Sequence, residues 1–166
     1  EPSLNNTQLP KADFCALTPH QAIKAEDSLC NVTQLLLGGA PTPHHFNHAG
    51  IYEGFGMTET ITHIALRKQG DEKYEALPGA VFSTNEGKLT INSPERGVQN
   101  LETDDVVELH SPNSFTWVGR GSDIINSGGI KHNPEHLESQ IRHLTSSDFA
   151  IYGVPHPELG QTIELR

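Results

Sequence analysis

The sequence predicts an α/β plus β fold: short parallel strands, then a small antiparallel sheet or barrel, then the start of a smaller α+β unit. Two short apolar segments, 32–37 and 51–55, each run into a glycine-rich turn. From residue 77 onward, short strand-like segments are separated by Gly, Pro, Asn and Asp. We therefore expect a larger unit over residues 1–120 and the beginning of a second unit over 121–166.

The individual elements follow from local patterns. Residues 1–13 are polar and carry two prolines, which predicts little regular structure. The strands expected in the antiparallel part are 88–92, 105–109 and 115–118. Residues 133–135, Asn-Pro-Glu, form a helix start with a capping Asn, Pro at the first position and an acid in the first turn. A strand is expected over 149–154, and the side chains expected on one face of the helix are Leu137, Ile141 and Leu144.

Charge and composition exclude some classes of partner. The chain has 11 basic and 21 acidic residues and a net charge of -10, which argues against a nucleic-acid groove or an anionic membrane surface but not against a nucleotide. No apolar run approaches the roughly 20 residues of a membrane span. Cys15 and Cys30 are expected to be free, buried or half-buried thiols, as in a cytoplasmic protein.

Two glycine-rich segments are the first candidates for chemistry. Gly38-Gly39-Ala40-Pro41 closes a strand with small residues, which lets a planar ligand approach the backbone. A tight turn is the alternative. In the segment 54–60, Phe55 offers an aromatic face to a base and Gly56 permits close approach. Its Thr58 hydroxyl suits a phosphate oxygen and its Glu59 carboxylate suits magnesium, although a polar turn capped by threonines is equally compatible.

Polar residues further along the chain are weaker candidates. Asp105 lies at the edge of a predicted strand, where a carboxylate can accept hydrogen bonds from a ribose diol or can simply belong to a turn. Arg120 has a glycine on either side, which indicates a hinge or a plain linker. His44, His45 and His48 lack partners at metal-ligand spacing and are expected in a solvated loop. His63 is better placed to line a substrate pocket.

The order of these segments is more specific than any one of them. GGAP, GFGMTET, TDD, WVGRGSDIINSGG and NPEHLE, in this order, resemble the adenylate-forming acyl-CoA synthetase (AMP-binding) superfamily from about residue 14 to the end. The resemblance implies that Thr58 lies near the α-phosphate, Glu59 holds magnesium, and Ser122 and Asp123 form the hinge between a large and a small domain. Asp105 and Arg120 would then contact the ribose. The nucleotide-binding residues that it implies are Gly38, Gly39, Ala40, Pro41, Phe55, Gly56, Met57, Asp105 and Arg120.

The sequences of three segments are similar to a narrower group within this superfamily. YEGFGMTETITHIALR, ALPGAVF and GRGSDIINSGGIKHNPEHLE are similar to o-succinylbenzoate–CoA ligases of menaquinone biosynthesis. This implies a carboxylate, ATP with Mg²⁺, and coenzyme A as reactants: acyl-AMP and pyrophosphate form first, and the thiol of coenzyme A then displaces AMP. Another acid as substrate, or a nucleotide-binding module without catalysis, remain the alternatives.

The chain also departs from the family pattern. The family has a Ser/Thr/Gly-rich phosphate loop that ends in Pro-Lys and a lysine near its C-terminus, and neither is expected among these 166 residues. Residues 38–50 number thirteen, which leaves little room for the helix that usually connects parallel strands. We expect a C-terminal part of a ligase, with a segment absent near His44–His48, that does not complete adenylation by itself.

Overall fold

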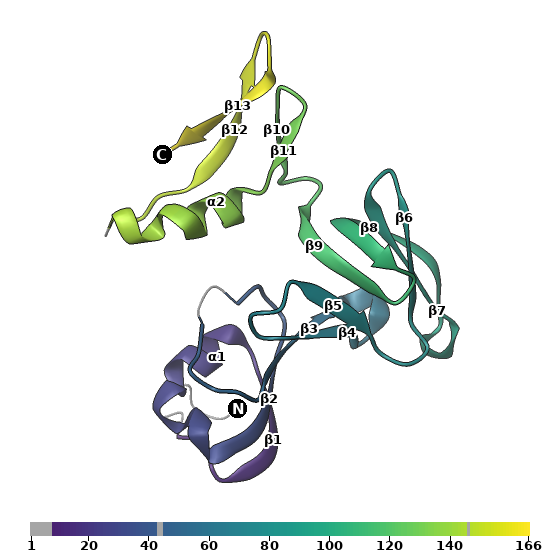
Figure 1. The fold of residues 1–166 in the computed structure, drawn as a ribbon, viewed down its shortest axis with the longest axis vertical. Helices are drawn as coiled ribbons and strands as arrows, with labels where there is room; N and C mark the ends of the chain where they lie inside the picture. The colour runs from purple at the N-terminus through teal and green to yellow at the C-terminus, as the bar shows by residue number, and fades with distance from the viewer. Residues whose placement is uncertain (1–7, 43–44, 146) are drawn as a thin grey trace.

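The computed structural model describes residues 8–42, 45–145 and 147–166, and its largest element is a sheet of nine strands in the order β1-β2-β3-β4-β5-β9-β8-β7-β6 (Figure 1). Its first three strands pair in parallel and the other neighbours pair antiparallel. The strands are β1 (Ala12–Leu17), β2 (Val32–Leu37), β3 (Ile51–Gly56), β4 (His63–Lys68), β5 (Lys73–Ala76), β6 (Val81–Asn85), β7 (Lys88–Ser93), β8 (Val98–Ser111) and β9 (Ser114–Arg120).

The parallel end of the sheet is covered on one face by two short helical segments. Between β1 and β2 the chain forms α1 (Pro19–Lys24) and the 3₁₀ segment η1 (Glu26–Asn31). Thr18 caps α1, because its hydroxyl accepts from the Gln21 N–H while the Gln21 side chain accepts from the Thr18 N–H. Buried residues from the helical region, from β2 and β3 and from the connection between these strands form the core here: Ala22, Ala25, Leu29, Val32, Leu35, Leu37, Phe46 and Ile51.

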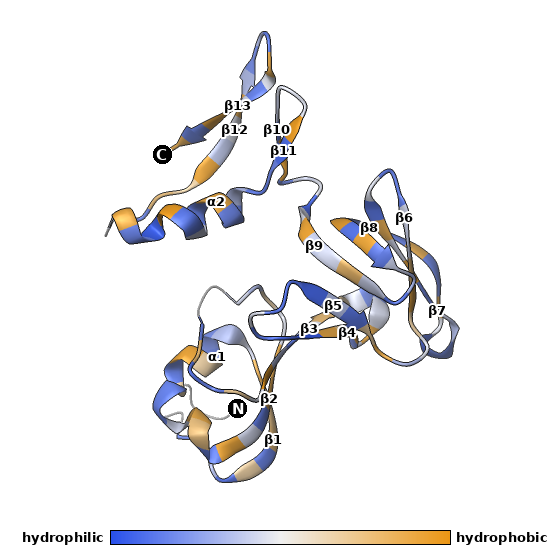
Figure 2. Ribbon diagram, viewed as in Figure 1, coloured by the Kyte–Doolittle hydropathy of each residue, from blue (hydrophilic) through white to orange (hydrophobic). Residues whose placement is uncertain are grey.

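The antiparallel end encloses a second core rich in aromatic rings. Phe115 stands at its centre, with ring centroids at 5.1 Å from Phe55, 5.5 Å from Tyr74 and 5.0 Å from Phe82. The contacts with Phe55 and Phe82 are edge-on and the contact with Tyr74 is stacked, and both arrangements are common for aromatic pairs. Burial raises the pKa of the Tyr74 hydroxyl, against the lowering effect of the nearby Arg67 guanidinium. Alternating hydrophobic and hydrophilic positions are visible along β8 and β9 in Figure 2.

A separate four-stranded sheet follows, in the order β11-β10-β13-β12. Its elements are β10 (Ile125–Ser127), β11 (Ile130–His132), α2 (Pro134–Ile141), η4 (Arg142–Leu144), β12 (Ile151–His156) and β13 (Gly160–Leu165). Asn133 caps α2, with its side chain accepting from the His136 N–H at 3.4 Å. Figure 1 shows this unit set apart from the nine-stranded sheet, joined to it after β9.

The fold class expected from sequence is confirmed, with local corrections. Strand β1 and helix α1 were not predicted, and β1 begins at Ala12 inside a segment expected to lack regular structure. The antiparallel strands continue the parallel sheet instead of forming a sheet of their own. The face expected to include Leu144 is also wrong: α2 ends at Ile141, and Leu144 is 72% exposed in η4.

The connection from β2 to the parallel strand β3 is short, as the sequence indicated. Its described residues, 38–42 and 45–50, contain no helix. His48 lies within it and is not simply solvated: its Nε2 lies 2.8 Å from the Val32 carbonyl, and its Nδ1 accepts from the Gly50 N–H at 3.1 Å. His45 is exposed, and His44 lies outside the described residues.

Candidate functional site

A pocket of about 630 Å³ lies at the carboxyl ends of the three parallel strands. In open α/β sheets, ligands bind in the crevice outside the carboxyl ends of the parallel strands. Three segments line it: the end of β1 with the start of α1, the glycine turn after β2, and the loop from β3 to β4. Gly38, Gly39, Gly56, Met57 and Thr58 contribute to its wall, so the two glycine-rich segments of the sequence meet in one place.

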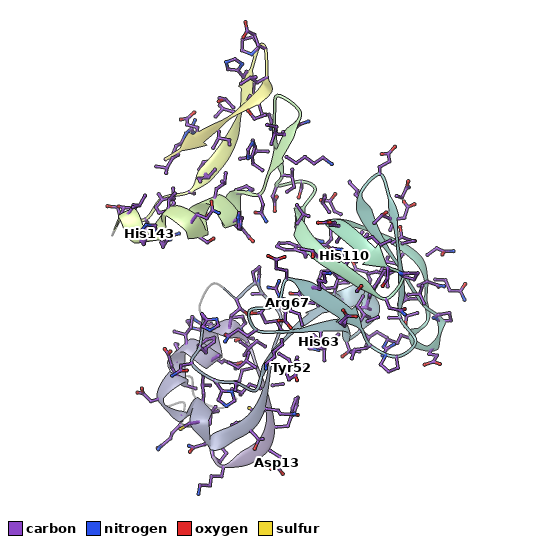
Figure 3. All side chains as sticks on the ribbon, viewed as in Figure 1. Asp13, Tyr52, His63, Arg67, His110 and His143 are labelled. Carbon is purple, nitrogen blue, oxygen red and sulfur yellow. The ribbon has the colours of Figure 1, made fainter. Side chains whose placement is uncertain are left out.

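His63 forms part of the same wall and explains two of the glycines. Its ring lies against the backbone of Gly38 and Gly54, and a Cβ at either position would collide with the ring. Gly39 adopts φ +88°, a conformation that suits glycine. Figure 3 shows His63 and Arg67 along β4.

The segment after β3 is held by a buried threonine. Residues Thr58–Thr60 form the 3₁₀ turn η2, and Thr60 is fully buried. Its hydroxyl accepts from the Met57 N–H at 3.0 Å and lies within donating distance of the carbonyls of Met57 and Thr62, at 2.9 and 2.8 Å. These bonds fix Thr58 at the pocket and leave Glu59 exposed on the turn.

Arg67 and Glu53 stabilise the β3–β4 pair that carries this segment. The two residues are cross-strand partners, and Arg67 Nε donates to Glu53 Oε2 at 2.7 Å. Glu53 is only 7% exposed, and the guanidinium also lies over the Tyr74 ring, 4.6 Å from its centroid. A buried carboxylate needs such a partner because an unpaired charge is strongly disfavoured there.

Asp105 and Arg120 form a second polar cluster away from the pocket wall. They are paired across β8 and β9, with Arg120 donating to Asp105 at 2.9 Å. Trp117 Nε1 donates to the other carboxylate oxygen at 2.9 Å, and Asp105 is 4% exposed. Neither charged residue lines the pocket. The structure thus brings these two residues together, but in a different place from the glycine-rich segments.

The adjacent Asp104 binds the segment expected to be the hinge. Its carboxylate accepts from Lys88 Nζ at 2.7 Å and from the Ser122 N–H at 2.8 Å. These two donors, the ammonium first, lower the pKa of Asp104 to about 2. Ser122 and Asp123 lie in the turn between β9 and β10, and the Ser122 hydroxyl donates to Asp123 at 3.0 Å.

The remaining predicted site residues are placed as follows. Ala40 and Pro41 are exposed beyond the glycine turn, and neither they nor Glu59 line the pocket. The ring of Phe55 packs in the aromatic core, so a role for this ring beside a base stays a prediction. Within the described ranges, no three His, Cys, Asp or Glu side chains gather as a metal-binding group. A Mg²⁺ ion fits Glu59 only as a single exposed carboxylate whose other ligands are phosphate oxygens and water.

Sequence reasoning missed the wall supplied by β1 and α1. Leu17, Thr18 and Gln21 all line the pocket. Thr18-Pro19-His20-Gln21 matches the capping-box pattern with Pro at the first helical position. That signal predicts a helix start here, and with it a third loop at the carboxyl edge of the sheet.

Two further expectations concern the chain as a whole. Cys15 and Cys30 are free cysteines, as expected, but only Cys15 is half-buried, and the expectation of burial is wrong for the exposed Cys30. Within the described residues, each helix is too short or too polar to cross a bilayer.

Comparison with known proteins identifies relatives of this chain among curated sequences and among solved structures. A search of protein-family models found no match. The medium/long-chain-fatty-acid–CoA/3-oxocholest-4-en-26-oate–CoA ligase of Mycolicibacterium smegmatis is 37% identical over 109 residues, which cover 65% of this chain and 17% of the ligase. Luciferin 4-monooxygenase of Luciola mingrelica is 25% identical, with 89% of this chain and 34% of the luciferase covered. That alignment spans 193 positions, more than the 166 residues here, so the luciferase carries residues without a counterpart in this chain.

Solved structures agree. An AMP-forming acyl-CoA synthetase/AMP-acid ligase II-like protein from Dyadobacter fermentans is 32% identical, with a TM-score of 0.56, covering 92% of this chain and 50% of that protein. E. coli MenE with a bound m-phenylether-linked analogue of OSB-AMS has a TM-score of 0.66 at 22% identity, covering 92% of this chain and 40% of MenE. The chain spans about a sixth to a third of the curated relatives. Its homologues and structural neighbours therefore include AMP-forming acyl-CoA ligases, and its fold is that of part of an acyl-CoA synthetase.

Proposed function

We propose that this chain is part of an AMP-forming acid–CoA ligase and that its pocket holds an acyl-adenylate. One observation carries the proposal: the Gly38-Gly39 turn and the Gly56–Thr58 segment, separate in the sequence, line the same pocket at the carboxyl edge of the sheet. The ligase relatives and the synthetase fold support it.

The proposed roles divide between the pocket and the Asp105–Arg120 cluster. The glycine turn and the backbone of Phe55 lie beside adenine, and the Thr58 hydroxyl donates to the α-phosphate. Asp105 and Arg120 hold the ribose. Asp105 has one protein donor on each oxygen, and a carboxylate has further lone pairs for the ribose hydroxyls. The ribose role requires that one ligand contacts both the Asp105–Arg120 cluster and the pocket.

The proposed reaction has two steps. The carboxylate of the acid attacks the α-phosphorus of ATP, pyrophosphate leaves, and the thiol of coenzyme A then displaces AMP from the acyl carbon. Catalysis of the first step is mainly positioning and charge neutralisation, which donors such as Thr58 supply. Bound Mg²⁺ would neutralise phosphate charge, with Glu59 as its protein ligand. Rotation of the small unit about Ser122–Asp123 would turn a different face of this unit toward the pocket between the two steps.

We propose o-succinylbenzoate as the acid. Three sequence segments are similar to o-succinylbenzoate–CoA ligases, and the pocket contains hydrogen-bond donors. Gln21 lines the pocket, and its Oε1 accepts from the Thr18 N–H at 2.8 Å. This bond fixes which end of the amide is oxygen and leaves its N–H₂ as the free donor. Together with His63, Gln21 can donate to the second carboxylate of such an acid.

Calorimetric titration of the chain with AMP, OSB-AMS and decanoyl-sulfamoyladenosine tests the proposal. OSB-AMS and decanoyl-sulfamoyladenosine are stable mimics of acyl-adenylates. We expect AMP to bind, OSB-AMS to bind more tightly than AMP, and the decanoyl compound to bind more weakly than OSB-AMS. Binding of none of the three would exclude an adenylate site. Tighter binding of the decanoyl compound would exclude o-succinylbenzoate as the acid and favour a fatty-acid ligase.

The magnesium role has its own test. Glu59→Gln removes the charge that Mg²⁺ requires but keeps the size of an exposed side chain. We expect Mg²⁺ to increase the ATP affinity of the wild-type chain and not that of the variant, with equal AMP affinity and equal Tm for both proteins. An equal Mg²⁺ effect in both would contradict the assignment of Glu59.

A further inference from the structure

Ile61, directly after the η2 turn, has an unusual backbone. It adopts φ 66° and ψ -38°, and the Thr62 N–H donates to the Thr60 carbonyl at 2.7 Å. This is a γ-turn of the positive-φ form, which is rare and strained. For a β-branched residue a positive φ is a true outlier, because the branched Cβ crowds the backbone. Glycine would adopt this conformation without the strain.

The strain is not offset by packing of the Ile61 side chain, which is 82% exposed. What holds the turn is Thr60, buried and bonded to Met57 on one side and close to the Thr62 carbonyl on the other. The fold therefore holds an apolar, β-branched side chain in a strained conformation and points it outward. Strained residues of this kind cluster at ligand sites.

The surroundings of Ile61 show what such a side chain would contact. It lines the 630 Å³ pocket together with the apolar residues Leu17, Leu36 and Met57. Three residues before it, Thr58 lies at the proposed phosphate end of the same pocket. Ile61 thus adds exposed apolar surface to the same pocket as Thr58.

We propose that Ile61 is a specificity-determining residue that packs on the acyl body of the bound acid and selects acids with a bulky apolar body over short acids such as acetate. The inference rests on the proposed adenylate site. Covering an isoleucine side chain fully is worth about 1.5–3 kcal/mol, or roughly a tenfold or greater change in affinity. A two-carbon acyl group has too little surface to provide this contact.

Ile61→Gly tests the inference, because strain relief and ligand contact predict opposite effects. We expect Tm to rise by about 2–4 °C for a chain of this size, while affinity for benzoyl-sulfamoyladenosine falls at least about tenfold. Affinities for AMP and acetyl-sulfamoyladenosine should stay within about twofold of wild type, since neither presents a bulky acyl body. Ile61→Val keeps the branched Cβ and is expected to lower benzoyl affinity a few-fold at unchanged Tm.

Glu86→Gly is the matched control. Glu86 has φ 51° in the β6–β7 turn and lies outside the pocket. This control should raise Tm similarly and leave all three affinities unchanged. Wild-type benzoyl affinity in both Ile61 variants, with AMP still bound, overturns the inference but not the adenylate site. A lower Tm for Ile61→Gly overturns it as well. If wild type binds neither AMP nor the benzoyl compound, the proposed function fails and the inference with it.

Discussion

At the scale of single residues, the arrangement of His63 over Gly38 and Gly54 decides the shape of the pocket. The sequence placed Gly38 in a nucleotide site and His63 in a substrate pocket and gave Gly54 no site role, and only the structure shows that the ring occupies the space that a Cβ at either glycine would need. Residue types alone carry no such information, because Gly54 and His63 meet through the pairing of β3 with β4.

A double-mutant cycle tests this contact. Gly54→Ala introduces a methyl group into the space of the His63 ring and should destabilise the chain by about 1–3 kcal/mol, as overpacking does. In the His63→Ala background the methyl group has room, so the same substitution should have little effect. The free energy of unfolding of the four proteins gives the coupling. Equal effects in both backgrounds would show that the ring does not lie over Gly54.

Phe55 shows the limit of motif reading at this scale. Its place in the sequence predicts an aromatic face beside a base, which stays a prediction, while the structure packs the ring against Tyr74 and Phe115. Strand alternation decides which face receives the side chain, and Phe55 is partly buried on the core face. A motif gives the order of residues but not the direction in which each side chain points.

At the scale of elements, the β3–β4 pair depends on the buried charge pair Glu53–Arg67. Arg67→Met would leave the Glu53 carboxylate buried and unpaired, which should cost about 3–5 kcal/mol. Adding Glu53→Gln removes the charge and should recover much of this loss. Chemical denaturation of the single and double variants measures both. As a control, Arg166→Met removes an exposed pair with Glu164 and should leave the midpoint unchanged. An equally small loss for Arg67→Met would contradict the account.

The segment joining the two units depends on Asp104. Because folding lowers the pKa of this carboxyl from 3.8 to about 2, its charged form stabilises the native state. That contribution is complete above about pH 5 and is lost progressively as the pH falls from about 5 to about 1. The Tm difference between wild type and Asp104→Asn should therefore be constant from pH 7 to pH 5 and shrink to a small remainder at pH 2. A difference as large at pH 2 as at pH 7 would assign the effect to packing instead of charge.

Most of the elements that were predicted carry a local signal, although the capping box of α1 is a local signal that was missed. Strand β2 is followed by glycine and β3 ends in glycine, and α2 begins after a capping Asn with Pro at its first position, so each could be located from sequence. Strand β1 has exposed Asp13 and Phe14, and its sequence lacks a strong strand signal. It forms because it pairs in parallel with β2, and this tertiary interaction cannot be predicted from the residues of β1 alone.

At the scale of the whole molecule, the order of short motifs predicted the fold class, and the arrangement in space explains why the order matters. The carboxyl edge of the parallel strands collects the glycine turn, the η2 turn and the start of α1 around one pocket. The Asp105–Arg120 cluster lies on β8 and β9, which are the fourth and the third strands beyond β3 in the sheet. Motif order places residues in one site but does not give the distances between them.

The central claim is that the pocket at the carboxyl ends of β1, β2 and β3 binds an acyl-adenylate. The most direct measurement is the ¹H–¹⁵N NMR spectrum of the chain during titration with OSB-AMS. The account predicts saturable shifts of the amides of Gly39, Gly56 and Thr58, with those of Gly70 and Gly97 in remote turns unchanged. Saturable shifts confined to residues outside the pocket, or no shifts at all, would contradict it.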